Sequence, residues 1–205
     1  IADGYLRQLS LGGKGPQPEL GNGGRRSYTL GQINELRALL EEGGKGKRYI
    51  QHRRGKEHCQ VLATVNFKGG SSKTTATIHL AQRFALRGYR VLALDLDPQA
   101  SLTTFFGFRP ELEFAESGTI YDALRYDDRV PLSSVIQKTY FHNLDMVPAG
   151  LLLSEYETET ANALARRQQP IFAERLSLAL DEVEADYDLI MIDCPPQLGF
   201  LTLTA

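Results

Sequence analysis

Residues 61–75 (VLATVNFKGGSSKTT) decide the fold of this 205-residue chain. An apolar run typical of a buried strand ends in two glycines, and a Lys-Thr-Thr segment then opens an amphipathic helix. The N-terminus of a helix offers unpaired backbone N–H groups and a positive dipole end, and glycines let the backbone close round an anion. We therefore predict a phosphate-binding loop between a strand and a helix.

The loop departs from the usual phosphate-binding pattern, G-x-x-x-x-G-K-[ST]. Phe67 and Ser72 stand where that pattern has its two glycines. What remains is K-G-G-x-x-K-T, with Lys73 in the usual position and an additional Lys68 ahead of it. A glycine pair after a strand is by itself often an ordinary tight turn, so the interpretation depends on motifs elsewhere in the chain.

Two later stretches are apolar runs that end in carboxylates. Residues 90–101 (RVLALDLDPQAS) carry Asp95 and Asp97, and residues 188–196 (DLIMIDCPP) carry Asp193. Charged residues at the C-terminal ends of three strands meet at one rim of a parallel sheet, where open α/β sheets bind ligands. The fold class predicted is therefore α/β, a P-loop NTPase with a mainly parallel sheet.

Charge is distributed unevenly along the chain. Residues 1–57 hold 11 Lys and Arg against 6 Asp and Glu, whereas residues 58–205 hold 12 against 19. This asymmetry indicates a basic nucleic-acid-binding module ahead of an acidic enzyme domain. Cys59 and Cys194 are too few for a disulfide framework or a zinc site. No apolar run approaches the ~20 residues of a membrane span, and Ile1 begins no signal peptide, so we expect a cytoplasmic protein without a membrane partner.

Residues 1–42 have the layout of a small DNA-binding module. We predict a short helix at 4–10, a Gly- and Pro-rich wing at 14–29, and an amphipathic helix at 29–42 with Thr29 as its N-cap. This order resembles a partial winged helix-turn-helix of the MerR type, which implies a helix in the major groove and a wing on the phosphates. The alternative is that its arginines are solvated surface charges. The residues assigned to DNA are Tyr5, Arg7, Gln8, Arg25 and Arg26.

Residues 43–58 read as a basic linker, and 59–205 as the P-loop domain. Such a linker is most often only solvated, but it could add phosphate contacts that weaken steeply with salt. Its basic residues are Lys45, Lys47, Arg48, Arg53, Arg54 and Lys56. Within the domain we predict four strands, at 61–66, 91–95, 144–147 and 189–193. The predicted helices lie at 74–87, 155–165 and 171–183, with short helices and loops at 98–106, 119–126 and 132–141.

At K-G-G-x-x-K-T, D-L-D-P-Q and D-C-P-P the chain resembles the ParA/MinD family of P-loop ATPases, whose loop carries the additional lysine. Within that family it is most similar to the RepA-type partition proteins of repABC plasmids, which also have the N-terminal module. Chains of this family continue past the third strand-end carboxylate, here Asp193, with further strands and helices. We therefore expect more of this domain beyond Ala205.

The resemblance implies ATP and Mg²⁺ as cofactors and gives each site residue a role. Lys73 reaches the β- and γ-phosphates, while Thr74 and Asp193 hold the Mg²⁺. Asp97 positions the attacking water, and Asp95 takes a metal-side or structural role. Lys68 crosses a nucleotide-sandwich homodimer to touch the phosphates of the partner subunit; the alternative is an ordinary surface lysine. The nucleotide-binding set is Lys68, Gly69, Gly70, Ser71, Ser72, Lys73, Thr74 and Thr75.

The function implied is a plasmid-partition ATPase that is weak alone. ATP-dependent dimers would bind operator and nonspecific DNA, a ParB- or RepB-like centromere-binding protein would stimulate turnover, and the N-terminal module would repress its own operon. One alternative is a repressor that uses ATP as a ligand without essential hydrolysis. A MinD-like membrane-associated ATPase is a second, which the basic module argues against. A relative of the nitrogenase iron protein is disfavoured because Cys59 is badly placed to bridge a cluster.

Overall fold

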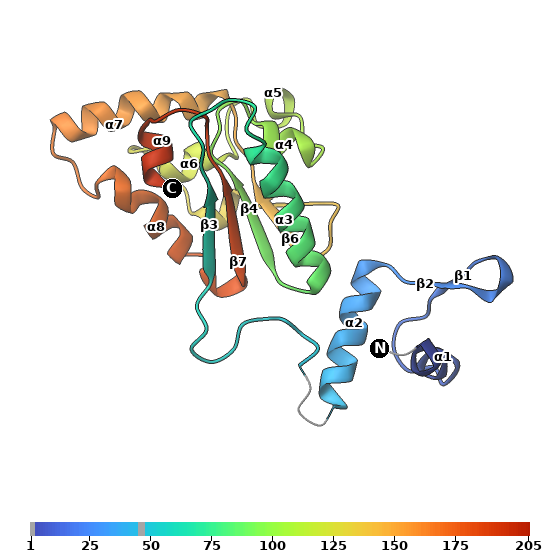
Figure 1. Cartoon of the computed structure of the whole chain (residues 1–205). Coiled ribbons are helices and arrows are strands. Elements are labelled where there is room, and N and C mark those ends of the chain that lie inside the picture. Colours follow the sequence, from blue (N-terminus) through green and yellow to red (C-terminus); the bar gives the residue numbers. More distant parts are fainter. Residues whose placement is uncertain (1–2, 45–47) are drawn as a thin grey trace. The chain divides into compact units, whose positions relative to one another are not determined.

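The computed structural model describes residues 3–44 and 48–205 and divides the chain into two compact units (Figure 1). The N-terminal unit comprises Ile1–His52 with Leu86–Gly88, and the sheet unit comprises Arg53–Ala85 with Tyr89–Ala205. Lys45 and Lys47 of the predicted basic linker lie outside the described residues.

The N-terminal unit contains a short helix, a two-stranded hairpin and a longer helix. These are α1 (Asp3–Leu11), the antiparallel strands β1 (Glu19–Leu20) and β2 (Arg26–Ser27), and α2 (Leu30–Glu42). A 3-10 turn, η1 (Asn22–Gly24), joins the two strands. Thr29 caps α2 as predicted, because its hydroxyl accepts the Gln32 N–H while the Gln32 side chain accepts the Thr29 N–H. A small core of Leu9, Leu36 and Leu40 holds the two helices together.

The sheet unit is built on five strands in the order β3-β7-β4-β6-β5. The four predicted strands are present and parallel: β3 (Gln60–Thr64), β4 (Val91–Asp95), β6 (Leu144–Val147) and β7 (Leu189–Asp193). The fifth was missed. Within the predicted helices and loops of 132–141, η2 (Leu132–Val135) is followed by β5 (Gln137–Lys138), antiparallel to β6. Two residues are too few for an alternating pattern to show in the sequence.

Helices cover both faces of the sheet (Figure 1). On the central strand β4, Val91 and Ala93 pack toward α3 and α4, whereas Leu92 and Leu94 pack into a core shared with the helices of the opposite face. Burial on both faces explains why the central strands read as continuous apolar runs. The helices are α3 (Lys73–Arg87), α4 (Ser101–Phe105), α5 (Pro110–Glu113), α6 (Ile120–Leu124), α7 (Glu155–Ala165), α8 (Phe172–Asp181) and α9 (Phe200–Thr204), with 3-10 turns η3 (Leu151–Ser154) and η4 (Glu184–Asp186).

The prediction that β3 is a buried strand was wrong. β3 pairs with β7 on one side only, and the side chains of Val61 and Leu62 are each 45% exposed. The difference arises because burial depends on neighbours across the sheet, which an apolar run cannot report. In the described part of the chain, no helix is long and apolar enough to cross a membrane.

Candidate nucleotide-binding site

The segment 65–72 joins β3 to α3 as a tightly curled loop. The Lys68 N–H donates to Asn66 Oδ1 at 2.9 Å, and the backbone turns into the left-handed region at Gly70 (φ 70°) and Ser72 (φ 63°). The first helical hydrogen bond then runs from the Ala76 N–H to the Ser72 carbonyl at 2.8 Å. The N–H groups of the first turn of α3 have no partner within the helix, so they are available to bind an anion.

The loop leaves space and an unsatisfied polar atom where a phosphate would lie. A Cβ atom added at Gly69 would meet nothing within 4 Å, so packing within the chain does not explain the absence of a side chain there. The Ser71 hydroxyl is buried without a hydrogen-bond partner among the described residues. Leaving a buried hydroxyl unpaired costs about 1–3 kcal/mol, and a phosphate oxygen at this point would satisfy it.

Asp193, at the end of β7, carries the second unsatisfied group. Its side chain is fully buried, and its Oδ2 has no hydrogen-bond partner in the described part of the chain. Burial raises the pKa of Asp193, and the Asp97 charge adds to this, while the Thr74 hydroxyl and the Lys73 charge act in the opposite direction. A carboxylate oxygen beside a threonine hydroxyl, with no protein donor of its own, fits a hard divalent cation such as Mg²⁺.

Two threonines that the sequence reading did not single out hold the loop against this carboxylate. Thr64, the last residue of β3, has its hydroxyl 2.6 Å from the Thr77 hydroxyl and 3.0 Å from the Ile192 carbonyl oxygen. The Thr77 hydroxyl also donates to the Lys73 carbonyl at 3.0 Å. These bonds join β3, α3 and β7 around Lys73. The sequence feature that could have indicated these bonds is a threonine at the end of the strand, Thr64, followed by one in the second turn of the helix, Thr77.

The carboxylates of the D-L-D segment have different environments. Asp97 is partly exposed in the loop after β4, and its Oδ1 accepts the Gln99 N–H at 2.9 Å. Asp95 is fully buried, and burial raises its pKa to about 7 against the opposing effect of its hydrogen bonds. Unlike Asp193, Asp95 has both carboxylate oxygens engaged by the chain, with the Asp97 N–H and with the N–H and hydroxyl of Thr103. The structural role is therefore the one of the two alternatives that fits Asp95.

The structure brings together four of the predicted site residues. Lys73, Thr74 and Asp97 all act on the pKa of Asp193, which places the four side chains at the C-terminal edge of the sheet. Of the other predicted loop residues, Ser71 is partly buried. The rest are exposed: Lys68, Gly69, Gly70, Ser72 and Thr75.

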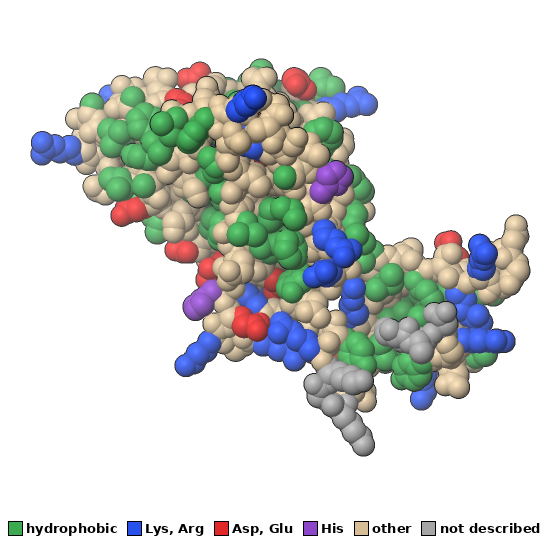
Figure 2. Space-filling view, viewed as in Figure 1, with side chains coloured by type: hydrophobic (Ala, Val, Ile, Leu, Met, Phe, Trp, Pro, Cys, Tyr) green, Lys and Arg blue, Asp and Glu red, His purple; other side chains and the backbone are tan. Residues whose placement is uncertain are grey.

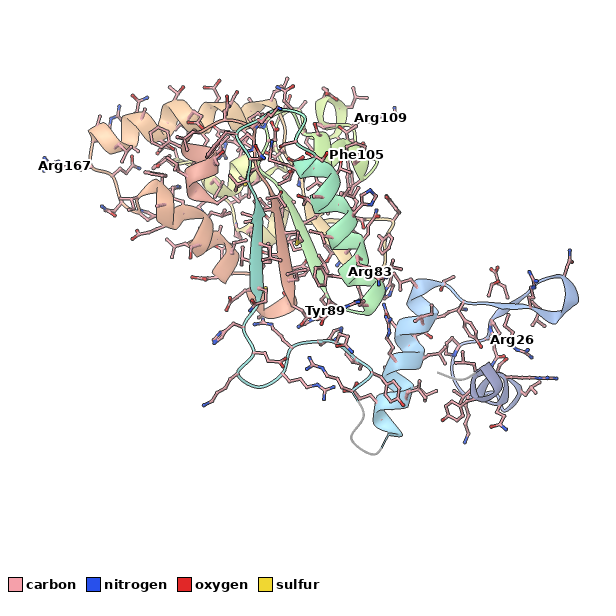
Figure 3. The ribbon with its side chains drawn as sticks, in the orientation of Figure 1. Arg26, Arg83, Tyr89, Phe105, Arg109 and Arg167 are labelled. Carbon is pink, nitrogen blue, oxygen red and sulfur yellow. The ribbon has the colours of Figure 1, made fainter. Side chains whose placement is uncertain are left out.

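The basic residues of the N-terminal unit form a separate feature, which we call the basic hollow. It has a volume of about 590 Å³ and is lined by Gly4, Leu6, Arg7, Arg25, Arg26, Ser27 and Tyr28. Arg26 Nε is buried in it without a hydrogen-bond partner among the described residues, between the hairpin and α1 (Figure 3). Lys and Arg side chains are abundant on this unit (Figure 2). Tyr5 and Gln8 are exposed on α1 but do not line the hollow.

A glycine-containing loop at the start of α3, facing a strand-end carboxylate on a parallel sheet, defines the class of P-loop nucleotide-binding folds. A family profile described as "AAA domain" matches residues 59–205. A Sinorhizobium fredii protein that carries the provisional name replication protein A is 51% identical over 211 residues, which cover 100% of this chain and 51% of that protein. The chromosome-partitioning ATPase Soj of Treponema pallidum is 36% identical over 144 residues, covering 70% of this chain and 51% of Soj. The chain belongs to the ParA/MinD family of P-loop ATPases.

A solved structure supports the fold independently. Cobyrinic acid a,c-diamide synthase from Mycobacterium smegmatis, with bound ADP and magnesium, aligns with a TM-score of 0.63 and 32% sequence identity. The alignment covers 71% of this chain and 55% of the synthase. The chain therefore spans about half the length of the relatives it matches.

Proposed function

We propose that the protein is a plasmid-partition ATPase that binds ATP and Mg²⁺ at the C-terminal edge of the sheet. The observation that carries the proposal is the convergence of Lys73, Thr74 and Asp97 on the buried side chain of Asp193, whose Oδ2 has no hydrogen-bond partner in the described part of the chain. Two comparisons support it: a relative named as a chromosome-partitioning ATPase, and a similar fold that holds ADP and magnesium.

The roles of the residues follow from phosphoryl transfer, which depends mainly on positioning and on neutralising charge. The N–H groups at the start of α3 bind the phosphates, and Lys73 places a positive charge on the β- and γ-phosphates. Thr74 and Asp193 would hold the Mg²⁺, which supplies further positive charge to the phosphate oxygens when it is bound. Asp97 orients a water for attack and accepts its proton.

We further propose that two copies of the chain enclose ATP and that Lys68 acts across this dimer. Lys68 is exposed beside Phe67, which is 60% exposed, and Leu198, in the loop after Asp193, is 67% exposed. Large apolar side chains on loops that follow two neighbouring strands provide area that a second copy could bury. ATP would then join the subunits, and hydrolysis would release them.

The experiment measures ATP binding and turnover in the complete protein with three lysine variants. Lys73→Gln should abolish both binding and turnover. Lys68→Gln should leave ATP binding by the single subunit within about threefold but remove dimerisation and turnover, because its ammonium acts on the partner's nucleotide. Lys138→Gln is the matched control, since this exposed lysine lies on β5 and pairs with Asp145. Normal turnover in Lys73→Gln would overturn the proposal.

The N-terminal unit supplies DNA binding in this proposal. A partial winged helix-turn-helix would place α1 with Tyr5 and Gln8 against base edges, while Arg7, Arg25 and Arg26 contact phosphates. The buried, unpaired Arg26 Nε supports an anion in the basic hollow. Replacing Arg25 and Arg26 with alanine should weaken DNA binding and reduce the slope of log affinity against log salt by about 2, whereas Arg166→Ala, at the C-terminal end of α7, should not.

The remaining parts of the proposal concern the cellular role. Dimers with ATP would bind operator and nonspecific DNA, so the protein would be cytoplasmic and nucleoid-associated. A ParB- or RepB-like centromere-binding protein would stimulate the weak basal turnover, and the N-terminal unit would repress its own operon. Reconstitution with plasmid DNA and the partner tests this: turnover that neither DNA nor partner changes would contradict it.

A DNA-binding repressor with ATP as a conformational ligand is the second candidate. It is favoured by the basic hollow, which shares no lining residue with the nucleotide loop. Asp97→Ala separates the two functions, because it removes the water-positioning carboxylate but leaves the phosphate-binding loop. Plasmid segregation should fail with Asp97→Ala if hydrolysis is needed, while operator repression persists.

A further inference from the structure

The buried carboxylate of Asp95 binds two parts of the chain directly and a third through Thr103. Its Oδ1 accepts the Asp97 N–H at 3.1 Å, and its Oδ2 accepts both the N–H of Thr103 at 2.9 Å and the Thr103 hydroxyl at 2.8 Å. The same hydroxyl accepts the Ala149 N–H at 3.0 Å. Asp95 and Thr103 therefore join the loop after β4, the helix α4 and the segment that follows β6.

The loop that carries Asp97 has few other attachments to the sheet. The Leu96 N–H donates to the Asp193 carbonyl at 2.9 Å, and the turn is otherwise closed by Asp97 itself, through its carboxylate and its carbonyl. The turn ends at Ala100, whose φ of 53° lies in the left-handed region that residues with a side chain rarely adopt. A strained turn with a partly exposed carboxylate keeps its geometry only if surrounding bonds fix it.

A buried carboxylate at position 95 would destabilise the fold if it served packing alone. Asp95 and Thr103 are both 0% exposed, and burying charge is costly unless hydrogen bonds compensate. Three donors on one carboxylate offset part of this cost, and one of them is the Asp97 N–H, whose direction the bond fixes. Such buried polar networks hold a unique geometry when every member is satisfied.

We propose that Asp95 and Thr103 are positioning residues for ATP hydrolysis. From the end of β4 and from α4, they hold the loop that carries Asp97 in place. The assignment rests on the proposed ATPase function, because it concerns the residue that orients the attacking water. Neither side chain touches nucleotide. Both act through the backbone of Asp97 and through the Ala149 segment that Thr103 ties to it.

The test compares three variants of the complete protein in steady-state ATP hydrolysis and nucleotide binding. Thr103→Val keeps the side-chain shape but removes the hydroxyl, so kcat should fall about tenfold while the Kd for ATP stays within about twofold. Thr103→Ser restores the hydroxyl and should bring kcat back to within about twofold of the original. Asp95→Glu keeps the charge but moves the carboxylate, and it should lower kcat by at least as much as Thr103→Val.

Thr139→Val is the matched control for a purely structural threonine. Its hydroxyl bonds the backbone of Phe141 and Leu144 at the opposite end of the sheet. This variant should lower the melting temperature without changing kcat. An unchanged kcat in Thr103→Val and Asp95→Glu, or a Thr103→Ser as impaired as Thr103→Val, would overturn the assignment. Absence of turnover in the unmutated protein would instead overturn the proposed function.

Discussion

The strand β7 has an aspartate at each end, and the two are satisfied in opposite ways. Asp188, just before the strand, accepts four hydrogen bonds, from the Arg53 N–H at 2.8 Å and from the backbone and side chain of Arg90 at 2.7–3.2 Å. Asp193, the last residue of the strand, is approached by the Thr74 hydroxyl and, at 3.5 Å, by the Thr64 hydroxyl, and its Oδ2 has no hydrogen-bond partner among the described residues.

The pKa values of the two carboxyls follow this difference. Burial alone would raise the pKa of Asp188, but the hydrogen bonds from Arg90 and from the Arg53 N–H outweigh burial and lower it. At Asp193 burial prevails and the pKa is raised. At the N-terminal edge of the sheet, hydrogen bonds from within the chain compensate the Asp188 carboxylate. At the C-terminal edge, the Asp193 carboxylate has an oxygen that is available to a ligand. Variants at the two ends should therefore fail in different ways.

The largest effect is expected from Asp193→Asn. Loss of the carboxylate removes the charge that we propose holds the cation, so Mg²⁺-dependent ATP turnover should fall at least a hundredfold, about 3 kcal/mol in activation free energy. Without ligands the variant should be as stable as the original or more so, because a buried charge has gone. Thermal unfolding with and without Mg²⁺ and ATP tests this. Stabilisation by Mg²⁺ and ATP of the same size as in the original protein would contradict it.

The next effect in size is that of Asp188→Asn, which should act on stability. Loss of the charge weakens four hydrogen bonds to a buried group, and we expect a loss of about 2 kcal/mol in the free energy of unfolding. The loss is smaller than for a fully buried ion pair because the Arg90 side chain is 32% exposed and can be hydrated. Affinity for ATP should stay within about twofold, since the proposed nucleotide site lies at the other end of the strand. Asp186→Asn is the control, because this neighbouring aspartate is exposed in η4. Equal denaturant midpoints for the two variants would refute the difference.

The contrast between the ends of β7 could be predicted only in part from the sequence. Apolar runs that end in Asp95, Asp97 and Asp193 correctly predicted a parallel sheet with its carboxylates at one rim. The environment of Asp188 could not be read, because its main partner, Arg90, is distant in the chain and pairs with it only when β4 lies beside β7. The exposure of β3 and the existence of β5 depend in the same way on neighbours across the sheet.

The D-L-D segment illustrates the same limit within one motif. A strand that continued to Asp97 would have both aspartates on one side, because they are two residues apart, but β4 ends at Asp95, so only the second aspartate lies in the loop. The donor that distinguishes them, Thr103, comes eight residues after Asp95 and meets it only because α4 folds back onto the strand end. Local patterns therefore locate the candidate site, while long-range packing sets the different environments of its residues.

A smaller effect should appear in the pH dependence of stability, with opposite signs at the two ends. For Asp188, whose pKa is lowered, the stability advantage over Asp188→Asn is complete above the unfolded value of about 3.9 and should vanish as the pH falls below it. For Asp193, whose pKa is raised, the charge opposes folding at neutral pH, so the advantage of Asp193→Asn should shrink as the pH falls toward about 3.9. Urea unfolding of metal-free protein across this range measures both. If both differences in the free energy of unfolding between variant and original protein disappeared over the same pH range, the opposite pKa shifts of Asp188 and Asp193 would be contradicted.

The smallest effect is expected in the loop that follows Asp193, where Gly199→Ala should cost about 1 kcal/mol, the typical value of a helix cap. The backbone at Gly199 is extended (φ −126°), so the glycine is needed for space: an added Cβ would collide with the Glu157 carboxylate, which accepts the N–H groups of Phe200 and Leu201 at 2.9 and 3.1 Å. The melting temperature should fall by about 2–4 °C. Because Glu157→Ala removes the same cap, the double variant should be no less stable than the worse single variant. If the losses of the two single variants added up in the double variant, the glycine would act independently of Glu157. The loop at the C-terminal end of β7 would then depend on contacts other than this carboxylate.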